Sequence, residues 1–415
     1  MTKPPPGRWR LLSLKLLTVI GGLLAAFLLL EILLRFLGTG LLYRSPHEML
    51  ATFDYRLGHG RYHRNRQGEM HIPFGDMVSL NRQLKPTIGE PRLMRYKTDS
   101  LGFRNDADYR NEPLLLVGDS FIAGSGSTQA DLLSAQLTRD YGIPAYNLAF
   151  PGKLHSYVRY VQTFFKTYRN SDARVLLFLF EGNDFPPGQP KSAVKPHKTE
   201  TPPSTFRIAR KEFQQSLKEL LVYRYAYSLY HLLNKKLRPA SYPQVTVIKV
   251  QGPRDLYLGF LDEYIKVTRR TSYHGDEEFL AKLARIKDRL AGIFFIPTKF
   301  RVYYNLLDLE PRPPLPDAQW AFLQEQARRL GVRCVNLTGP LQEESRRLLP
   351  EGKLTFWKDD SHWNRYGMAV AARTIQAFWQ KQEVSDENVS LREGTRGRKP
   401  LPPPSSSLPQ PLKGE

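Results

Sequence analysis

The sequence predicts an α/β fold: a three-layer α/β/α sandwich around a parallel sheet of about five strands, preceded by one N-terminal transmembrane helix. Two observations predict this architecture. Short apolar runs of strand length alternate with helical segments, which is typical of a parallel sheet covered on both faces. An uncharged apolar run near the N-terminus is long enough, with its apolar flanks, to span a bilayer.

The composition allows one large domain with appendages and restricts its partners only loosely. The 415 residues are 41% apolar and 24% charged, and 61 Lys and Arg against 40 Asp and Glu give a net charge of +21. Since the basic residues are spread along the chain without an RNA-binding motif, we expect no nucleic-acid partner. Anionic lipid or polysaccharide fits the charge as well. The single cysteine, Cys334, excludes an intramolecular disulfide and a Cys-based zinc site, and we interpret it as a small buried hydrophobe.

The N-terminal apolar run is interpreted as an uncleaved anchor. Leu16–Leu30 carries no charge, and we predict a cytoplasmic N-terminus over 1–15 and a transmembrane anchor over 16–37. The positive-inside rule then places the rest of the chain in the periplasm or outside the cell. A cleaved signal peptide is the alternative, but the apolar region is long for that role and no clear cleavage site follows. The basic residues before the run are Lys3, Arg8, Arg10 and Lys15.

The remaining chain divides by composition into three parts. Residues 43–111 are rich in Arg, His, Gly and Pro and predict an irregular lead-in, followed by the α/β domain over 112–382 with an insertion at 185–291. Residues 383–415 predict a disordered basic tail rich in Pro and Ser. The lead-in histidines match no zinc spacing, so we interpret them as solvated; they are His59, His63 and His71.

The apolar pattern of the sequence predicts the positions of the strands and helices. The expected strands are Leu114–Val117, Ala145–Ala149, Val175–Phe180, Gly292–Pro297 and Val332–Leu337. The expected helices of the main domain are Gln129–Tyr141, Val158–Tyr168, Asp317–Leu330 and Asn364–Gln380. The insertion predicts helices at Phe206–Leu237 and Asp276–Leu290 and a short strand at Val245–Val250. Aromatic residues crowd the first of these helices, and we interpret them as packing against the main sheet, with the lining of a substrate cleft as the alternative.

A serine follows the first expected strand, where ligands bind in open α/β folds. It ends the tripeptide Gly118–Ser120 (GDS), and it either caps the next helix or acts as a nucleophile. A nucleophilic serine needs a base, an acid that orients the base, and donors for an oxyanion. His362 is the candidate base, with Asp359 three residues and Asp360 two residues before it. An acid at such a short offset can orient an imidazole from the same loop.

Two further strand-end loops offer oxyanion donors. Gly152 lies in NLAFPG after the second strand, and Asn183 lies in EGNDF after the third. Because parallel strands end at the same rim of the sheet, these loops should lie beside Ser120. The backbone N–H groups of Ser120 and Gly152 and the side chain of Asn183 would then form a three-donor oxyanion hole.

Taken in order, these blocks resemble those of the SGNH (GDSL-like) hydrolase superfamily, over about residues 98–380. The stretch DSLGFRND at 99–106 resembles the lead-in of membrane-anchored bacterial members. FIPTKFRVYY at 295–304 and DSHWNRYG at 360–367 are similar to the subgroup related to alginate O-acetyltransferases. Two positions depart from the pattern: Phe121 stands where leucine is usual, and Glu181 replaces the first glycine of the third block.

The resemblance implies a role for each site residue. Ser120 would be the nucleophile, His362 the general base, and Asp359 the acid that orients His362, since the family offset favours Asp359 over Asp360. Ser120, Gly152 and Asn183 would be the oxyanion donors. Asp119 and Asp184 are interpreted as structural residues that cap or brace the loops. No metal and no organic cofactor is expected.

We therefore predict a serine-dependent acyl-ester hydrolase that acts on an acylated glycan of the cell envelope, or on a small ester, through an acyl-serine intermediate. The first alternative is an O-acetyltransferase, which would need a membrane acyltransferase partner to deliver the acyl donor. The second is a non-catalytic glycan-binding module. The triad does not separate hydrolysis from transfer, because the acceptor site and the exclusion of water decide between them.

Overall fold

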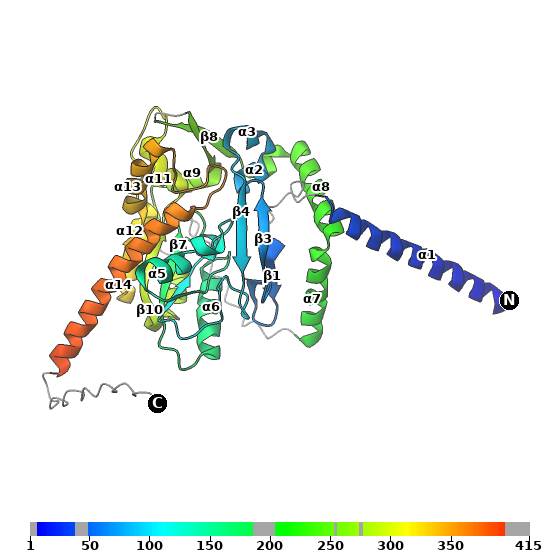
Figure 1. The fold of residues 1–415 in the computed structure, drawn as a ribbon, viewed down its shortest axis with the longest axis horizontal. Helices are drawn as coiled ribbons and strands as arrows, with labels where there is room; N and C mark the ends of the chain where they lie inside the picture. Colours follow the sequence, from blue (N-terminus) through cyan, green and yellow to red (C-terminus); the bar gives the residue numbers. More distant parts are fainter. Residues whose placement is uncertain (1–5, 38–48, 186–203, 253–254, 274–276, 395–415) are drawn as a thin grey trace, which may run out of the picture. The chain divides into compact units, whose positions relative to one another are not determined.

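The computed structural model describes residues 6–37, 49–185, 204–252, 255–273 and 277–394 (Figure 1). Its centre is a five-stranded sheet of order β11-β10-β7-β5-β6 in which all neighbouring strands are parallel. The predicted α/β fold with a five-stranded parallel sheet is therefore confirmed. The strands are β5 (Leu114–Val117), β6 (Ala145–Asn147), β7 (Arg174–Phe180), β10 (Leu290–Ile296) and β11 (Cys334–Asn336).

Continuous burial explains why the sequence forms this sheet. Every residue of β5 and β10 is buried, as is all of β7 after its first residue. Uninterrupted apolar runs are what a parallel sheet needs when helices cover both faces. The edge strands β6 and β11 have three residues each, and β11, which contains Cys334, is only half-buried. Cys334 is thus less buried than the sequence suggested.

Four helices lie close to predicted positions: α5 (Leu133–Tyr141), α6 (Leu154–Thr167), α10 (Glu277–Ala284) and α12 (Ala318–Leu330). Two further helices, α11 (Lys299–Tyr303) and α13 (Thr338–Leu348), were not predicted. The expected helix Gln129–Tyr141 is divided, because a 3-10 turn over Gln129–Asp131 precedes α5. The α6 helix buries one face through tyrosine, valine and phenylalanine side chains, which agrees with its amphipathic pattern.

The described part of the lead-in, 49–111, contains strands and helices, so the prediction of an irregular segment over 43–111 is wrong for most of that part. Two antiparallel hairpins form there, β1 (Ala51–Asp54) with β2 (His59–Tyr62), and β3 (Gln67–Ile72) with β4 (Arg92–Lys97). Two short helices, α2 (Asp76–Leu80) and α3 (Lys85–Ile88), lie between β3 and β4, with a 3-10 turn over Arg82–Leu84. These strands show no clear apolar alternation, because β3 is mostly exposed and β4 buries Arg92 while it exposes Leu93.

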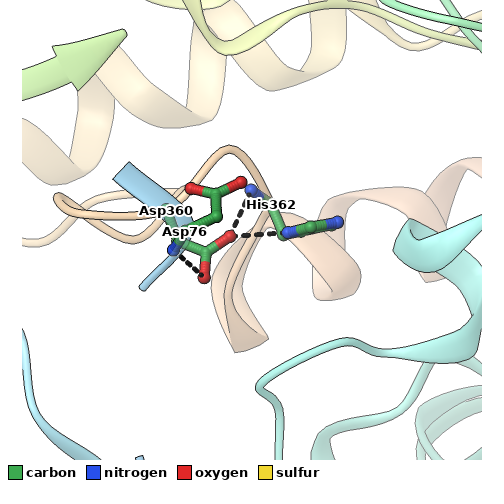
Figure 2. Close-up of side chains that lie close together, drawn as sticks. All are labelled: Asp76, Asp360 and His362. Atoms are coloured by element: carbon green, nitrogen blue, oxygen red, sulfur yellow. Dashed lines mark hydrogen bonds and ion pairs between the residues drawn. The ribbon is translucent and has the colours of Figure 1, made fainter. Parts of the chain in front are cut away.

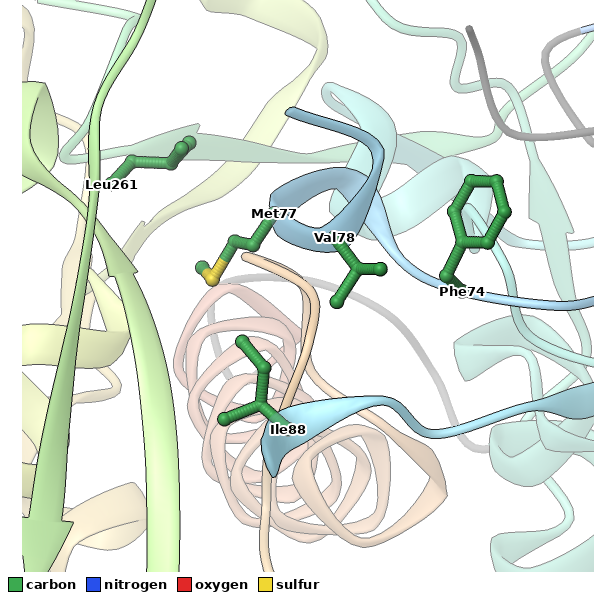
Figure 3. Packing of buried hydrophobic residues seen from close by; sticks show 5 residues of the cluster. All are labelled: Phe74, Met77, Val78, Ile88 and Leu261. Atoms are coloured by element: carbon green, nitrogen blue, oxygen red, sulfur yellow. The ribbon is translucent and has the colours of Figure 1, made fainter. Parts of the chain in front are cut away.

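The lead-in packs against the insertion through its own small core. Phe74, Met77, Val78 and Ile88 are buried in one cluster with Leu261 (Figure 3). Leu261 ends β9 (Leu256–Leu261), which pairs antiparallel with β8 (Val245–Val250) of the insertion. The segment before the sheet is thus an integral part of the fold.

His59 in β2 is also part of a packed region rather than solvated as expected. It is 4% exposed and meets Tyr160 of α6 edge to face, at 4.7 Å between ring centroids. Burial lowers the pKa of His59, which favours the neutral ring.

The aromatic part of the insertion differs from the prediction in two ways. One helix was expected over 206–237, but the chain breaks at Leu220, which is extended, into α7 (Thr205–Glu219) and α8 (Leu221–Leu237). Tyr223 and Tyr230 of α8 are exposed, so packing of this aromatic stripe against the main sheet is wrong for these residues. The insertion continues with a 3-10 turn over Pro239–Ser241 and with α9 (Asp262–Thr268).

The first and last helices extend beyond the predicted limits. Helix α1 spans Pro6–Leu34, and Arg10–Leu34 is long and apolar enough to cross a membrane. Helix α14 spans Arg365–Gly394, so the first part of the predicted tail, 383–394, is helical. The rest of that tail, 395–415, lies outside the described residues.

Candidate active site

Ser120 is presented by a strand, a tight turn and one helical turn. It is the first residue of α4 (Ser120–Ala123), three residues after the end of β5. Asp119 caps this helix, because its carboxylate accepts a hydrogen bond from the Phe121 N–H at 2.9 Å. Gly124 ends the helix with φ 71°, a left-handed conformation that favours glycine. The GDS turn therefore places Ser120 at the carboxyl end of an inner strand of the sheet.

His362 lies between this serine and a carboxylate. The distance from His362 Nε2 to Ser120 Oγ is 2.7 Å, and the distance from Nδ1 to an Asp360 carboxylate oxygen is 2.5 Å. In its neutral form the imidazole donates from Nδ1 to Asp360, so Nε2 accepts from the Ser120 hydroxyl. Figure 2 shows His362 with Asp360 and with a second carboxylate, Asp76. This is the relative geometry of a serine, its general base and an orienting acid.

The carboxylate that contacts His362 belongs to Asp360 and not to Asp359, so the expectation from the sequence, which named Asp359, is wrong. The Asp359 carboxylate is fully buried and faces the lead-in, where it accepts the N–H groups of Gly75 at 2.8 Å and Glu90 at 3.0 Å. Asp360 carries the bond to Nδ1 in its place. Because the side chain of Asp359 is occupied by these main-chain donors, the acid two residues before the histidine takes the orienting position.

Arg92 of β4 binds both carboxylates and is buried at 9% exposure. Its guanidinium donates to Asp360 at 2.8 Å and to Asp359 at 3.2 Å, and it also donates to the Gly126 carbonyl at 3.1 Å. The guanidinium lies 4.4 Å from the centre of the Trp357 ring. One oxygen of Asp360 thus faces His362 and the other faces Arg92, which fixes the carboxylate in rotation.

The turn before α2 approaches the histidine loop closely. A Cβ atom at Gly75 would lie 2.4 Å from the Asp359 carbonyl oxygen and 2.7 Å from the Asp360 Cβ, so only glycine fits there. The next residue, Asp76, accepts the Ser361 N–H at 3.0 Å and also binds the Ser361 hydroxyl. These contacts fasten the loop that carries His362.

Lys299 fixes the same loop from the other side. Its ammonium group donates to the carbonyls of Trp357 at 2.7 Å, Lys358 at 2.9 Å and Asp360 at 3.2 Å. Burial lowers the pKa of Lys299 to about 8, although nearby carboxylates act in the opposite direction. Lys299 belongs to FIPTKFRVYY and Asp360 to DSHWNRYG, so the structure joins the two segments that the sequence singled out.

The charges around His362 favour its protonated form. Burial alone would lower the pKa of His362, but the charge and hydrogen bond of Asp360, with the charges of Asp76 and Asp119, raise it to about 9. Burial and the charge of Asp360 raise the pKa of Asp76 to about 7. Burial likewise raises the pKa of Asp119 to about 6.

The two proposed oxyanion loops are joined by a tyrosine. Gly152 follows β6 and Asn183 follows β7, the two strands that flank β5. The Tyr157 hydroxyl lies 2.9 Å from the Gly152 carbonyl oxygen and 2.8 Å from Asp184. Asp184 also accepts the Phe180 N–H at 2.8 Å, so it braces its loop as the sequence suggested. Both loops lie at the same rim as Ser120, and their role as oxyanion donors remains a prediction.

The unusual Glu181 of the third block has a structural partner. It is buried beside Arg301, whose guanidinium donates to both carboxylate oxygens at 2.6 to 3.0 Å, and it accepts the Thr298 N–H at 2.9 Å. The pair connects the end of β7 to the start of α11, the helix that carries Lys299. Glu181 thus helps to place the segment that fixes the histidine loop.

One group of potential metal ligands lies within the described residues at this site. Ligand atoms of Asp76, Asp360 and His362 lie within 4.8 Å of one another (Figure 2). The hydrogen bonds already described use both ring nitrogens of His362, one toward Asp360 and one toward Ser120. A metal bound through either nitrogen would replace one of these two bonds, so the donor set suits a hydrogen-bonded triad better than a cation.

The fold and this geometry define a serine–histidine–aspartate site on an SGNH hydrolase-like α/β domain. Residues 260–400 match the family model described as the SGNH hydrolase-like domain of the acetyltransferase AlgX. This part of the chain, which contains Lys299, Asp360 and His362, is thus similar to the SGNH hydrolase-like domain of AlgX. No curated protein matches the sequence.

Sequence inspection missed the residues that support the histidine. Arg92, Gly75 and Asp76 lie in a segment that was interpreted as an irregular lead-in, and no spacing links them to His362. The signal that was present is indirect: Asp359 and Asp360 are adjacent acids close to Trp357 and Trp363, and two carboxylates that become buried require a cation or several N–H donors.

Proposed function

We propose that this protein is an acyl-ester enzyme that forms an acyl-serine on Ser120. One observation carries the proposal: Ser120, His362 and Asp360 form a continuous hydrogen-bonded line, with distances of 2.7 and 2.5 Å. A serine hydroxyl is a weak nucleophile unless a base accepts its proton, and a base needs a fixed orientation to do so. The contacts of His362 with Ser120 and with Asp360 support both requirements.

In the proposed reaction the neutral His362 takes the hydroxyl proton as Ser120 Oγ attacks the ester carbonyl. The new C–O bond leaves negative charge on the former carbonyl oxygen, which the N–H groups of Ser120 and Gly152 and the Asn183 amide would stabilise. His362 then returns the proton to the departing alcohol as the ester C–O bond breaks. The negative charge of Asp360 stabilises the imidazolium that exists between the two steps.

Water is the acceptor in the first candidate function, an esterase or deacetylase. His362 removes a proton from water, the hydroxide attacks the acyl-serine, and the acid is released with Ser120 regenerated. This reaction needs no group beyond those proposed above.

A sugar hydroxyl is the acceptor in the second candidate, an O-acetyltransferase. The match of residues 260–400 to the domain of the acetyltransferase AlgX favours it. We propose that the substrate in either case is an acylated glycan of the cell envelope, and that a transferase would receive its acyl group from a membrane partner. A glycan-binding module without catalysis is the remaining alternative.

We further propose that α1 anchors the protein in a membrane with the N-terminus in the cytoplasm and the α/β domain in the periplasm or outside the cell. The support is the length and composition of Arg10–Leu34 and the basic residues before it. The net charge of +21 would favour an anionic glycan.

The test compares the full chain in detergent with its Ser120→Ala variant. Each is incubated with 4-nitrophenyl acetate, with and without oligosaccharide acceptors, while nitrophenol release is followed and the products are weighed. Release that requires Ser120 and yields acetate supports the esterase, and acetylated sugar supports the transferase. Equal rates for the two proteins on acetate and on longer acyl esters would refute acyl-serine chemistry, and oligosaccharide binding would then be measured.

A further inference from the structure

The helices α7 and α8 expose an unusual amount of apolar surface. Among the described residues outside α1 and its C-terminal extension, most of the exposed large hydrophobic side chains lie on these two helices. Tyr230 is 61% exposed and Leu233 is 54% exposed. We call this surface the α7–α8 apolar face; its members are Phe206, Phe213, Leu217, Tyr223, Leu229, Tyr230, Leu232, Leu233 and Leu237. A patch of this kind indicates an interaction site.

The apolar residues of α8 follow the helical repeat. Tyr223, Tyr230, Leu233 and Leu237 are separated by seven, three and four residues, so they lie along one side of the helix. An exposed stripe that extends over most of a 17-residue helix is a continuous surface rather than a set of isolated side chains.

Basic residues accompany the apolar face. The segment 205–238 contains eight basic and two acidic residues. A helix pair with exposed leucine and aromatic side chains and an excess of positive charge is typical of a segment that lies in the interface of an anionic bilayer. The basic residues are Arg207, Arg210, Lys211, Lys218, Arg224, Lys235, Lys236 and Arg238.

A direct contact ties α8 to the end of the candidate membrane helix. The carboxylate of Glu31 in α1 accepts the N–H groups of Leu221 at 2.9 Å and Val222 at 3.0 Å, so it caps the start of α8. The Tyr225 hydroxyl then donates to the Leu37 carbonyl at 3.0 Å. These bonds join the last turns of α1 and the residues after it to the first turns of α8.

The position of Glu31 along α1 sets the depth of this contact. A helix rises about 1.5 Å per residue, so Glu31 lies about 31 Å from Arg10. This distance matches the roughly 30 Å thickness of the hydrocarbon core. With Arg10 at one interface, Glu31 and the start of α8 reach the other one.

We propose that the α7–α8 apolar face docks on the anionic lipid bilayer that holds α1, with its apolar side chains among the acyl chains and its basic side chains at the headgroups. This inference rests on the membrane anchoring proposed above. It adds a second attachment beside the anchor, and it would hold the hydrolase-like domain in a fixed orientation at the lipid surface.

The test measures the depth of spin labels on the full chain in vesicles of phosphatidylethanolamine and phosphatidylglycerol. In a Cys334→Ser background, single labels are placed by Tyr230→Cys or Leu233→Cys on the apolar face, by Leu24→Cys in α1, and by Gln324→Cys on the exposed side of α12. The accessibility of each label to oxygen and to a water-soluble nickel complex is compared. We expect the labels at 230, 233 and 24 to be reached by oxygen in preference to nickel, and the label at 324 to show the reverse.

The outcomes separate the two proposals. A label at 24 in lipid with the labels at 230 and 233 in water would overturn docking of α7–α8 and leave the anchor intact. A label at 24 in water would refute the anchor itself. The labels at 230 and 233 could also be protected from the nickel complex only at high protein density. Protection that disappears when the protein is diluted to one chain per vesicle would show that a second copy covers the face, which also overturns the proposal.

Discussion

Ser120 and His362 meet at one hydrogen bond, yet the chain positions them in opposite ways. Ser120 depends on its neighbours: β5 ends just before it, Asp119 caps its helix and Gly124 ends that helix. His362 depends on distant segments. The residues that hold its loop come from the lead-in, 268 positions away in the case of Arg92 and Asp360, and from Lys299.

This difference shows that the lead-in is part of the candidate active site, because its residues hold the loop of His362. Apart from Asp119, whose charge also acts on His362, substitutions near Ser120 should act on the serine, whereas substitutions in residues 75–92 should reach His362 through its carboxylate. The four predictions below test this division, in order of decreasing effect.

The largest effect is expected from the acid on His362. Asp360→Asn removes the negative charge that stabilises the imidazolium and favours the wrong tautomer, so kcat on 4-nitrophenyl acetate should fall by about 10²–10⁴. Asp359→Asn, the same change at the neighbouring position, is the matched control. It should lower the free energy of unfolding by about 1–3 kcal/mol, because buried hydrogen bonds are weakened, while the pH profile of kcat stays close to wild type. The reverse ranking of the two variants in kcat would assign the orienting role to Asp359.

The choice between these two acids shows what the sequence could and could not predict. GDS, Gly152, Asn183 and His362 were located because each follows a recognisable element or a local pattern. The spacing to an acid was ambiguous, because both offsets allow an acid to reach an imidazole. Which side chain turns toward the ring depends on the N–H groups of Gly75 and Glu90, which bind the Asp359 carboxylate on the side of the lead-in.

The same difference between local and distant determinants decided which parts of the fold could be predicted. The strands β5, β7 and β10 were predicted because they are buried on both faces and read as uninterrupted apolar runs. The strands β3 and β4 were missed because they lack an apolar alternation: β3 is mostly exposed, and β4 buries Arg92 and exposes Leu93. The break between α7 and α8 could not be seen either, since Glu31 supplies the cap from 190 residues away.

The second prediction concerns the cation in the lead-in. Arg92→Met leaves two buried carboxylates without their cation, which should reduce the free energy of unfolding by about 3–5 kcal/mol. Arg95→Met, on the same strand, breaks an ion pair with Glu69 in which both side chains are more than half exposed, so its effect should stay below about 1 kcal/mol. Urea titrations of both variants in detergent provide the measurement. Equal stability of the two would show that the lead-in does not support the histidine loop.

The third prediction concerns close packing at Gly75. A methyl group there would overlap the Asp359 carbonyl and the Asp360 Cβ, so Gly75→Ala should push the histidine loop away. We expect a loss of about 1–3 kcal/mol in the free energy of unfolding together with a lower kcat. Gly339→Ala is the control, since no atom lies within 4 Å of the Cβ it would add. If kcat falls equally in both variants, the effect does not arise from the contact at residues 359–360.

The smallest effect is a shift in the pH dependence of the reaction. Only neutral His362 accepts the serine proton, and its pKa is raised to about 9, so kcat/KM should increase with pH up to that region. Negative charge on Asp76 contributes to this raised pKa. Asp76→Asn should therefore lower the pKa of His362 and move the rising limb of the profile toward lower pH, whereas Asp140→Asn, at an exposed position, should leave it in place. A rising limb that stays at the wild-type pH in Asp76→Asn would mean that the lead-in fastens the histidine loop without changing the pKa of His362. The lead-in would then determine the position of His362 but not its protonation.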